Sequence, residues 1–231
     1  ILTIFEKRVQ KKDLPFFMGL MEKLNEKKII CPRPLKNNNN KHLCEIKKKP
    51  ACIVTFLEGS DKTNLNYKNC FDIGKNIAKF HKITTKMKLY RQNSMSIKKL
   101  DVLLKSISFK SIEISPSLKP ILNECLKDIK NKWPKKLPEG IIHGDLFIDN
   151  IFFNKNKFSG FIDFYFSSND YLMYEIAICI NSLCFDKKNK YFVMNNKKVK
   201  HLIDGYESIR PFSKKEKSAL NILCRGAALR Y

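Results

Sequence analysis

The sequence has little of what builds a domain held together by zinc or disulfides. Its eight cysteines are spread along the chain, no C-x-x-C pair occurs, and no two Cys or His residues stand at the spacing of zinc ligands. Several cysteines lie in apolar runs, as in "AICINSLCF" (177–185). This pattern predicts reduced thiols that fill a core, and therefore a cytoplasmic protein rather than a secreted one.

Long apolar runs are also missing. No segment has the length needed to span a bilayer, so we expect no membrane partner. The opening "ILTIFEKRV" is too short and too soon charged for a secretory signal. The sequence starts inside a strand-like run and ends, with "LCRGAALRY", inside a helical one, which predicts a piece of a longer chain.

Acidic residues are scarce, with 22 Asp and Glu against 45 Lys and Arg, giving a formal net charge of +23. One interpretation is a nucleic-acid or anionic-membrane partner, because Lys and Arg neutralise phosphates. The other is a solvated basic surface. The Lys runs fall in separate segments without an interleaved aromatic pattern, which favours the second interpretation and no specific nucleic-acid partner.

What is present is a core, since 43% of the residues are hydrophobic. The first sixty residues predict a strand at 1–5, a helix at 13–28 and strands at 41–46 and 51–59. After Gly59 the periodicity is helical, and Ser213 with Glu216 three residues later has the form of a capping box. The predicted helices are 68–82, 96–107, 117–133, 172–185 and 213–231. The order predicts an α+β fold with a small mixed lobe (1–58), a hinge near 56–60 and a mainly helical lobe (59–231).

Polar residues concentrate in one predicted β-hairpin, with strands at 147–153 and 158–166. The pattern is H-G-D-x-x-x-x-N, formed by His143, Gly144, Asp145 and Asn150, and Asp163 follows thirteen residues later. Phosphoryl transfer from ATP needs a carboxylate that accepts the hydroxyl proton and oxygen ligands that hold Mg²⁺. We therefore predict Asp145 as the catalytic base and Asn150 with Asp163 as metal ligands. The alternative is that these residues only form turns.

These residues resemble the aminoglycoside-phosphotransferase-like kinases, relatives of protein kinases that have H-G-D in place of H-R-D. The likeness runs through "DLPFFMGLMEKL", "GKNIAKFH" and "IIHGDLFIDNIFF". It is closer still to the homoserine kinases that adopt this fold, mainly through "IDFYFSSNDYLMYEIAICIN" (162–181). The resemblance implies a protein-kinase-like two-lobe fold, ATP and Mg²⁺ as cofactors, and phosphorylation of L-homoserine on the way to threonine.

The resemblance also implies roles around the hairpin. Asp145 would be the base, and His143 would be a structural member of the catalytic loop that orients Asp145 or braces Asp163. Asp170 would brace the hairpin from the next loop. Glu175 stands where similar sequences have Asp, and it is assigned no catalytic role.

On the nucleotide side, the resemblance implies that Phe56, Glu58 and their neighbours offer backbone groups to adenine. Kinases of this fold pair a Lys on the third strand with a Glu on the next helix. The first strand here has Thr3 in its middle, so Lys7, on the same face, and Glu22 are the candidates; Lys7 is equally well explained as a surface charge. The family's first strands would precede residue 1.

Two alternatives stay open at this point. A kinase of the same fold could act on choline, ethanolamine, a sugar or an aminoglycoside, or the chain could be a basic binding module or a pseudokinase. For homoserine, which carries an amine and a carboxylate, Arg225 and Asp149 are candidate contacts, although Asp149 is also explained as a turn cap.

Overall fold

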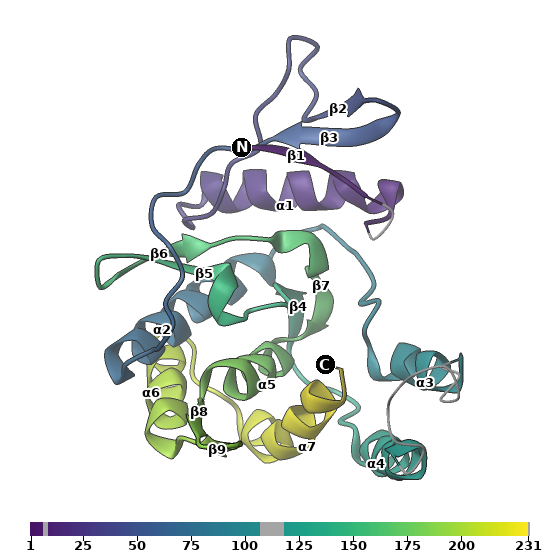
Figure 1. Cartoon of the computed structure of the whole chain (residues 1–231), viewed down its shortest axis with the longest axis vertical. Helices are drawn as coiled ribbons and strands as arrows, with labels where there is room; N and C mark the ends of the chain where they lie inside the picture. Colours follow the sequence, from purple (N-terminus) through teal and green to yellow (C-terminus); the bar gives the residue numbers. More distant parts are fainter. Residues whose placement is uncertain (7–8, 107–117, 231) are drawn as a thin grey trace.

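The structure is a computed structural model that describes residues 1–6, 9–106 and 118–230 of the 231-residue chain. The part around a three-stranded sheet is called the small lobe below, and the rest is called the large lobe (Figure 1). The predicted α+β, two-lobe kinase fold is confirmed, whereas the boundary at residue 58 stays a prediction. None of the described helices is long and apolar enough to cross a membrane.

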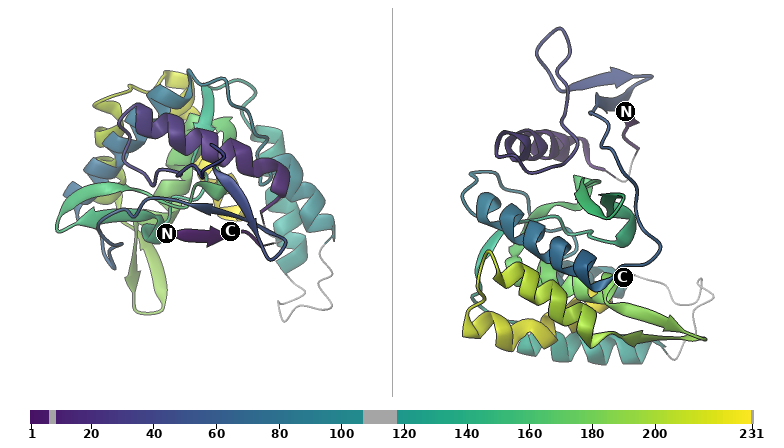
Figure 2. Two further views of the ribbon diagram at one scale, coloured as in Figure 1. Left: turned by 90° about the horizontal axis from the view of Figure 1, so that it is seen from above. Right: turned by 90° about the vertical axis from the view of Figure 1, so that its left-hand side faces the viewer.

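The small lobe is an antiparallel sheet resting on one helix. It contains β1 (Leu2–Ile4), α1 (Leu14–Glu26), β2 (Leu43–Ile46) and β3 (Lys49–Ile53), with strand order β1-β3-β2. Pro15 in the first turn of α1 fits the fixed φ of proline, and Leu20 and Leu24 lie on its buried face. Helix α1 lies between the sheet and the large lobe (Figures 1 and 2). The cavity between the two lobes that Val9, Gln10, Arg91 and Asp163 help to line is called the cleft below.

The large lobe is mainly helical. Its helices are α2 (Tyr67–Thr84), α3 (Ile97–Ser106), α4 (Leu118–Lys132), α5 (Leu172–Leu183), α6 (Asn196–Glu207) and α7 (Lys214–Arg230). Its strands form three antiparallel pairs: β4 (Glu139–Ile142) with β7 (Ser168–Tyr171), β5 (Ile151–Asn154) with β6 (Lys157–Phe161), and β8 (Phe185–Lys188) with β9 (Tyr191–Met194). The predicted helices and the polar hairpin are confirmed; α6 and the pairs β4–β7 and β8–β9 were not predicted.

Several predicted strands are shorter than expected. The strand predicted over 147–153 begins only at Ile151, because a 3₁₀ turn occupies Ile148–Asn150. The strand predicted over 158–166 ends at Phe161, because Asp163 takes a left-handed conformation with φ of 59° and a 3₁₀ turn follows at Phe164–Phe166. The strand predicted over 51–59 ends at Ile53. In the last two places apolar residues continue past the strand, so composition alone did not mark its end.

One hydrophobic cluster extends through both lobes, from Phe17 of α1 to Leu146 and Phe164 beside the polar hairpin and on to Leu202 of α6. Helix α5 runs through its middle and is buried over nearly its whole length, which fits a sequence without polar alternation. All eight cysteines are free thiols, five of them in this core, as the sequence predicted. A smaller cluster joins α3 and α4 through Leu100, Leu126 and Ile129.

Helices α2 and α6 pack closely enough to require glycine at the contact (Figure 2). A Cβ on Gly74 would lie 2.0 Å from the carbonyl oxygen of Leu202, and a Cβ on Gly205 would lie 2.0 Å from that of Phe71. Both obstacles are backbone atoms, which cannot turn aside as a side chain would. The contact therefore fixes the spacing of α2 and α6.

We expect Gly74→Ala to destabilise the protein by about 2 kcal/mol, although alanine favours a helix, because the two backbones must separate. Chemical denaturation measures this. The matched control is Gly19→Ala in α1, where the new Cβ would meet nothing closer than Leu89 at 4.0 Å. That variant is expected to keep or raise stability by up to about 1 kcal/mol. Equal losses in both variants would contradict the packing argument.

Candidate active site

The candidate catalytic loop, which contains His143, Gly144 and Asp145, follows β4 directly, and the hairpin β5–β6 comes next along the chain. Asn150 ends a 3₁₀ turn (Ile148–Asn150) directly before β5, and Asp163 follows β6 by two residues. The Ile162 N–H donates to the Asn150 carbonyl at 3.1 Å, so the two candidate metal ligands stand at the open end of one hairpin. The Asn150 side chain donates to the Asp145 carbonyl (2.7 Å) and to its carboxylate (3.2 Å). Asp145, Asn150 and Asp163 are thus brought together.

Asp145 has the environment of a proton acceptor. Partial burial raises the pKa of Asp145 above its ordinary value, and the negative charges of Asp163 and Asp149 act in the same direction. His143 and Arg230 oppose the shift. A carboxylate with a raised pKa is a stronger base than a free one.

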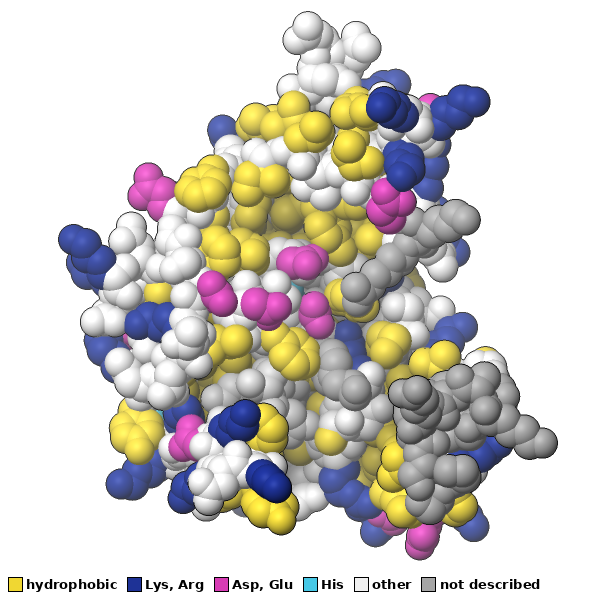
Figure 3. Space-filling view, viewed as in Figure 1, with side chains coloured by type: hydrophobic (Ala, Val, Ile, Leu, Met, Phe, Trp, Pro, Cys, Tyr) yellow, Lys and Arg dark blue, Asp and Glu magenta, His cyan; other side chains and the backbone are white. Residues whose placement is uncertain are grey.

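The donor set suits Mg²⁺. Asn150 offers an amide oxygen and Asp163 a carboxylate, and within the described ranges no three His, Cys, Asp or Glu form a closed cage. Mg²⁺ prefers such sparse oxygen sites, because it keeps waters and takes phosphate oxygens of the nucleotide. In Figure 3 acidic side chains gather in the hollow below the small lobe, whereas Lys and Arg lie mostly toward the edges of this face.

His143 braces the strand end before Asp163. Its ring is fully buried, and Nε2 lies 2.8 Å from the carbonyl oxygen of Ile162, to which it donates. The ring also packs against Phe164, with centroids 4.6 Å apart. The side chain therefore faces the metal hairpin rather than the cleft.

Glu175, in the first turn of α5, holds the loop from behind. Its carboxylate accepts the N–H groups of both His143 and Gly144, the second at 3.0 Å. Burial alone would raise the pKa of Glu175, but His81, His143 and the Gly144 N–H favour the anion and lower it below its ordinary value. Gly144 has a φ of +78°, and a Cβ there would lie 3.0 Å from the Phe166 carbonyl, so only glycine suits this turn.

A buried polar chain continues behind Glu175. His81 Nε2 lies 3.8 Å from the Glu175 carboxylate, and Nδ1 lies 2.8 Å from the Tyr206 hydroxyl. Arg210 reaches that hydroxyl at 3.4 Å and pairs with Glu216 at 2.8 Å. Glu216 also accepts the Ser213 N–H, which confirms the predicted capping box of α7. Sequence reasoning missed Glu175 and His81 as loop supports, since both lie in apolar helical stretches and looked like parts of a core.

The predicted Lys7–Glu22 pair stays a prediction, but Glu22 has partners that the sequence did not suggest. Its carboxylate contacts Lys36 (3.2 Å) and His42 (3.3 Å), and Lys7 lies outside the described residues. Burial of Glu22 raises its pKa, but Lys36 and His42 outweigh burial and lower it overall. Phe5, directly after β1, packs edge-on against Tyr165 with ring centroids 5.0 Å apart, so the end of β1 lies against the segment just after Asp163.

The hinge is tied to the hairpin. The carbonyl of Glu58 accepts the Ser159 hydroxyl, and Ser60 and Phe153 exchange both backbone hydrogen bonds at 2.8 and 3.0 Å. The Glu58 carbonyl therefore has one partner within the protein, and its predicted contact with adenine stays a prediction. Phe56 is 69% exposed beside it.

Of the candidate acceptor contacts, Arg225 points away from the site. It is exposed on α7 and hydrogen-bonds Asp128 of α4. Arg230, five residues further along the same helix, is buried and donates to the Gly144 carbonyl beside the base. Five residues turn a helix by more than a full turn, so the two arginines face different surroundings. Asp149 is exposed next to Asn150.

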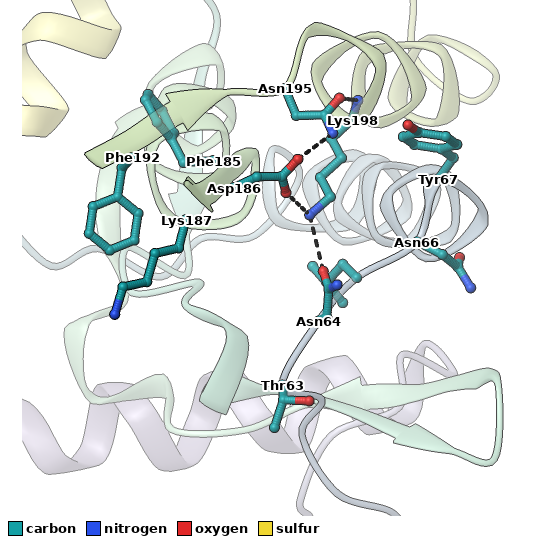
Figure 4. Close-up of a pocket in the computed structure, with 11 residues that line it drawn as sticks. Thr63, Asn64, Asn66, Tyr67, Phe185, Asp186, Lys187, Phe192, Asn195 and Lys198 are labelled. Atoms are coloured by element: carbon teal, nitrogen blue, oxygen red, sulfur yellow. Dashed lines mark hydrogen bonds and ion pairs between the residues drawn. The ribbon is translucent and has the colours of Figure 1, made fainter. Parts of the chain in front are cut away.

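Two adjoining cavities lie in the large lobe near the loop. One, of about 380 Å³, is lined by Phe147, Ser182 and Phe192 among others. The second, of about 630 Å³, shares Phe192 and is shown in Figure 4. There the buried Lys198 pairs with Asp186 (2.6 Å) and reaches Asn64 (3.2 Å). This ion pair ties the hairpin β8–β9 to α6 and to the linker beyond the hinge.

Comparisons with known proteins agree with this geometry. The model of a phosphotransferase enzyme family matches residues 1–212. Homoserine kinases of Allorhizobium ampelinum and Rhizobium meliloti are 41% and 42% identical over the whole chain, which spans 71% and 70% of their lengths. Among solved structures, the amicoumacin kinase hAmiN (TM-score 0.77, 15% identity, 99% of this chain and 71% of that one) is similar. So is a choline kinase from Cryptosporidium parvum (0.69, 15%, 100% and 73%). At 15% identity these structures support the fold alone.

The burial of His81 gives a testable pH dependence. Burial lowers the pKa of His81, so the unfolded chain binds more protons at this residue below about pH 6.5. Stability contributed by neutral His81 is present above that pH and is lost as the pH falls. In His81→Gln we expect the free energy of unfolding to depend less on pH between 5 and 6.5, by up to about 1.4 kcal/mol per pH unit.

Denaturant titrations at several pH values measure both slopes, and the value at pH 7.5 gives the packing cost of the substitution separately. Parallel pH profiles for the two proteins would rule out a neutral buried His81.

Proposed function

The chain belongs to the phosphotransferase enzyme family, and we propose that it transfers the γ-phosphoryl group of ATP to the hydroxyl of L-homoserine, giving O-phospho-L-homoserine. The observation that carries the chemistry is the hairpin mouth, where Asp145, Asn150 and Asp163 converge. The acceptor rests on about 41% identity to homoserine kinases over all 231 residues. The product is a precursor of threonine.

Asp145 accepts the proton of the acceptor hydroxyl while that oxygen attacks the γ-phosphorus. The O–H bond breaks, the new P–O bond forms, and the bond to the β-phosphate oxygen breaks to release ADP. Asn150 and Asp163 would hold Mg²⁺, which when bound offsets the negative charge of the phosphates. Glu175 and His143 keep the loop and the strand end in place during the transfer.

The acceptor is a zwitterion, so its site needs a cation and an anion or carbonyl. We propose Arg230 for the carboxylate in place of Arg225, because Arg230 is the buried cation whose charge acts on Asp145. Asp149, whose charge also acts on Asp145, is proposed for the amine.

Substrate choice is tested with a coupled ADP-release assay in Mg·ATP with L-homoserine, L-serine, choline, an aminoglycoside and a sugar. We expect kcat/KM for L-homoserine to exceed that for L-serine, one methylene shorter, by about 10-fold or more, and the others by a wider margin. Preference for another acceptor would discard the substrate and keep the chemistry. No ADP release with any of the five would contradict the proposed function and favour a pseudokinase or binding module.

Two substitutions separate the base from the metal ligand. Asp145→Asn removes the proton acceptor, so we expect kcat to fall by about 10² to 10⁴ with little change in Mg·ATP binding. Asp163→Ala removes a carboxylate ligand, so we expect weaker Mg·ATP binding and a higher Mg²⁺ requirement. Calorimetry with Mg·ADP and single-turnover kinetics measure the two effects. Loss of Mg·ATP binding in Asp145→Asn would contradict its role as the proton acceptor. An unchanged Mg²⁺ dependence in Asp163→Ala would contradict its role as a metal ligand.

A further inference from the structure

Arg91 lies in the segment between α2 and α3, and this segment is fastened to the end of the metal hairpin. The Asn169 N–H donates to the Arg91 carbonyl at 2.8 Å, and the Arg91 N–H donates to the Asn169 side chain at 2.9 Å. Asn169 belongs to β7, the strand that follows the turn after Asp163. The backbone of Arg91 is therefore fixed to the large lobe.

The side chain of Arg91 reaches both lobes at once. Its Nη1 donates to the carbonyl of Ser167 at 3.0 Å, four residues after Asp163. Its Nε donates to the carboxylate of Asp13 at 2.7 Å, at the start of α1 in the small lobe. The guanidinium also lies over the ring of Phe17, 5.0 Å from its centroid. The planar fork of arginine can serve two acceptors in fixed directions, which a lysine cannot.

Asp13 is the N-cap residue of α1, yet its side chain makes no capping hydrogen bond. An N-cap aspartate normally accepts an N–H of its own helix and stabilises it by about 1 kcal/mol. Here the carboxylate is turned to Arg91 instead, with side chains only 13% and 18% exposed. Because the pair is mostly shielded from solvent, removing one partner would leave the other partly buried without a counter-charge.

The same side chain borders the metal ligand. Arg91, Asp163, Tyr165 and Phe166 line a cavity of about 240 Å³ between the lobes. The ring of Tyr165 packs edge-to-face against the ring of Phe17, with centroids 5.6 Å apart. Phe17 is the ring over which the Arg91 guanidinium lies. Helix α1, the Arg91 side chain and the turn after Asp163 are thus in contact with one another.

We propose that Arg91 is a positioning residue that joins α1 to the turn after Asp163 and so sets the small lobe over the bound nucleotide. The hinge connects the lobes at the other end of α1, where the helix ends, whereas Arg91 holds its beginning (Figure 1). With both of its ends held, helix α1 cannot tilt away from the proposed metal site. The inference rests on the ATP-dependent function proposed above.

The test uses the full chain and a double-mutant cycle of Arg91→Gln and Asp13→Asn, read by calorimetry with Mg·ADP and by the KM for ATP. Each single substitution is expected to raise the Kd of Mg·ADP about 10-fold, and the double variant no further than either one, because both break the same link. We expect kcat at saturating substrate to change less than about 3-fold, because the base is untouched.

Lys49→Gln is the matched control, since it removes a short ion pair with Glu6 that stays within the small lobe. Its Kd is expected to equal that of the unsubstituted chain. Arg91→Lys keeps the charge but not the fork, so it should fall between the unsubstituted chain and Arg91→Gln.

Several results would overturn the proposal: an unchanged Kd in Arg91→Gln, independent effects that multiply in the double variant, or full recovery in Arg91→Lys. A lower melting temperature with unchanged Kd would reduce Arg91 to a structural part. Failure of the unsubstituted chain to bind Mg·ADP would contradict the proposed function. Binding of Mg·ADP by this chain with the same Kd in the variants would contradict only the role of Arg91.

Discussion

The geometry of the site depends on one buried carboxylate, Glu175, which accepts the N–H groups of His143 and Gly144 together. Buried backbone donors need acceptors, and an ionised acceptor makes these bonds stronger than a neutral one would. Because Asp145 is the next residue, holding these two peptide groups also fixes the backbone position of Asp145, the proposed base. Burial would raise the pKa of Glu175, but His81, His143 and the Gly144 N–H together lower it, so the loop and the anion stabilise each other. Removing either partner would leave the other buried without a counterpart, which is the costly outcome.

The helices behind Glu175 are arranged to support that charge. His81 comes from α2 and Tyr206 from α6, and their 2.8 Å contact requires the two helices to approach closely. Gly74 and Gly205 allow that approach, because any side chain there would strike backbone. From Tyr206 the polar chain passes through Arg210 to Glu216 at the start of α7. The packing of α2, α6 and α7 and the orientation of the loop after β4 therefore depend on the same contacts, namely the two glycines and the buried polar chain.

The sequence predicted the parts of the site whose geometry is local. Asn150 and Asp163 stand at the two ends of one hairpin, so strand pairing brings them together, and Asp145 lies only five residues before Asn150, whose side chain donates to it. Residues whose partners are distant in the chain were missed or misplaced. Glu175 meets the loop from 31 and 32 residues away, and His81 meets Tyr206 from 125 residues away. The loop residues Lys36 and His42, which contact Glu22 of α1, were likewise not foreseen as its partners. Periodicity reports which face of an element is buried, not which other element covers it.

The charge of the chain is divided in a way that its total conceals. A net charge of +23 suggests a protein that binds polyanions, yet partial burial and the negative charges of Asp163 and Asp149 raise the pKa of Asp145 beside the hairpin. Such a cleft repels a bare nucleotide and favours one that arrives with a divalent cation. A cation held by Asn150 and Asp163 would also oppose the upward shift of the Asp145 pKa, so the base and the metal ligands act on one another through the same field. Total charge therefore says little about the chemistry at this place, whereas the order of residues around one hairpin predicted which side chains meet there.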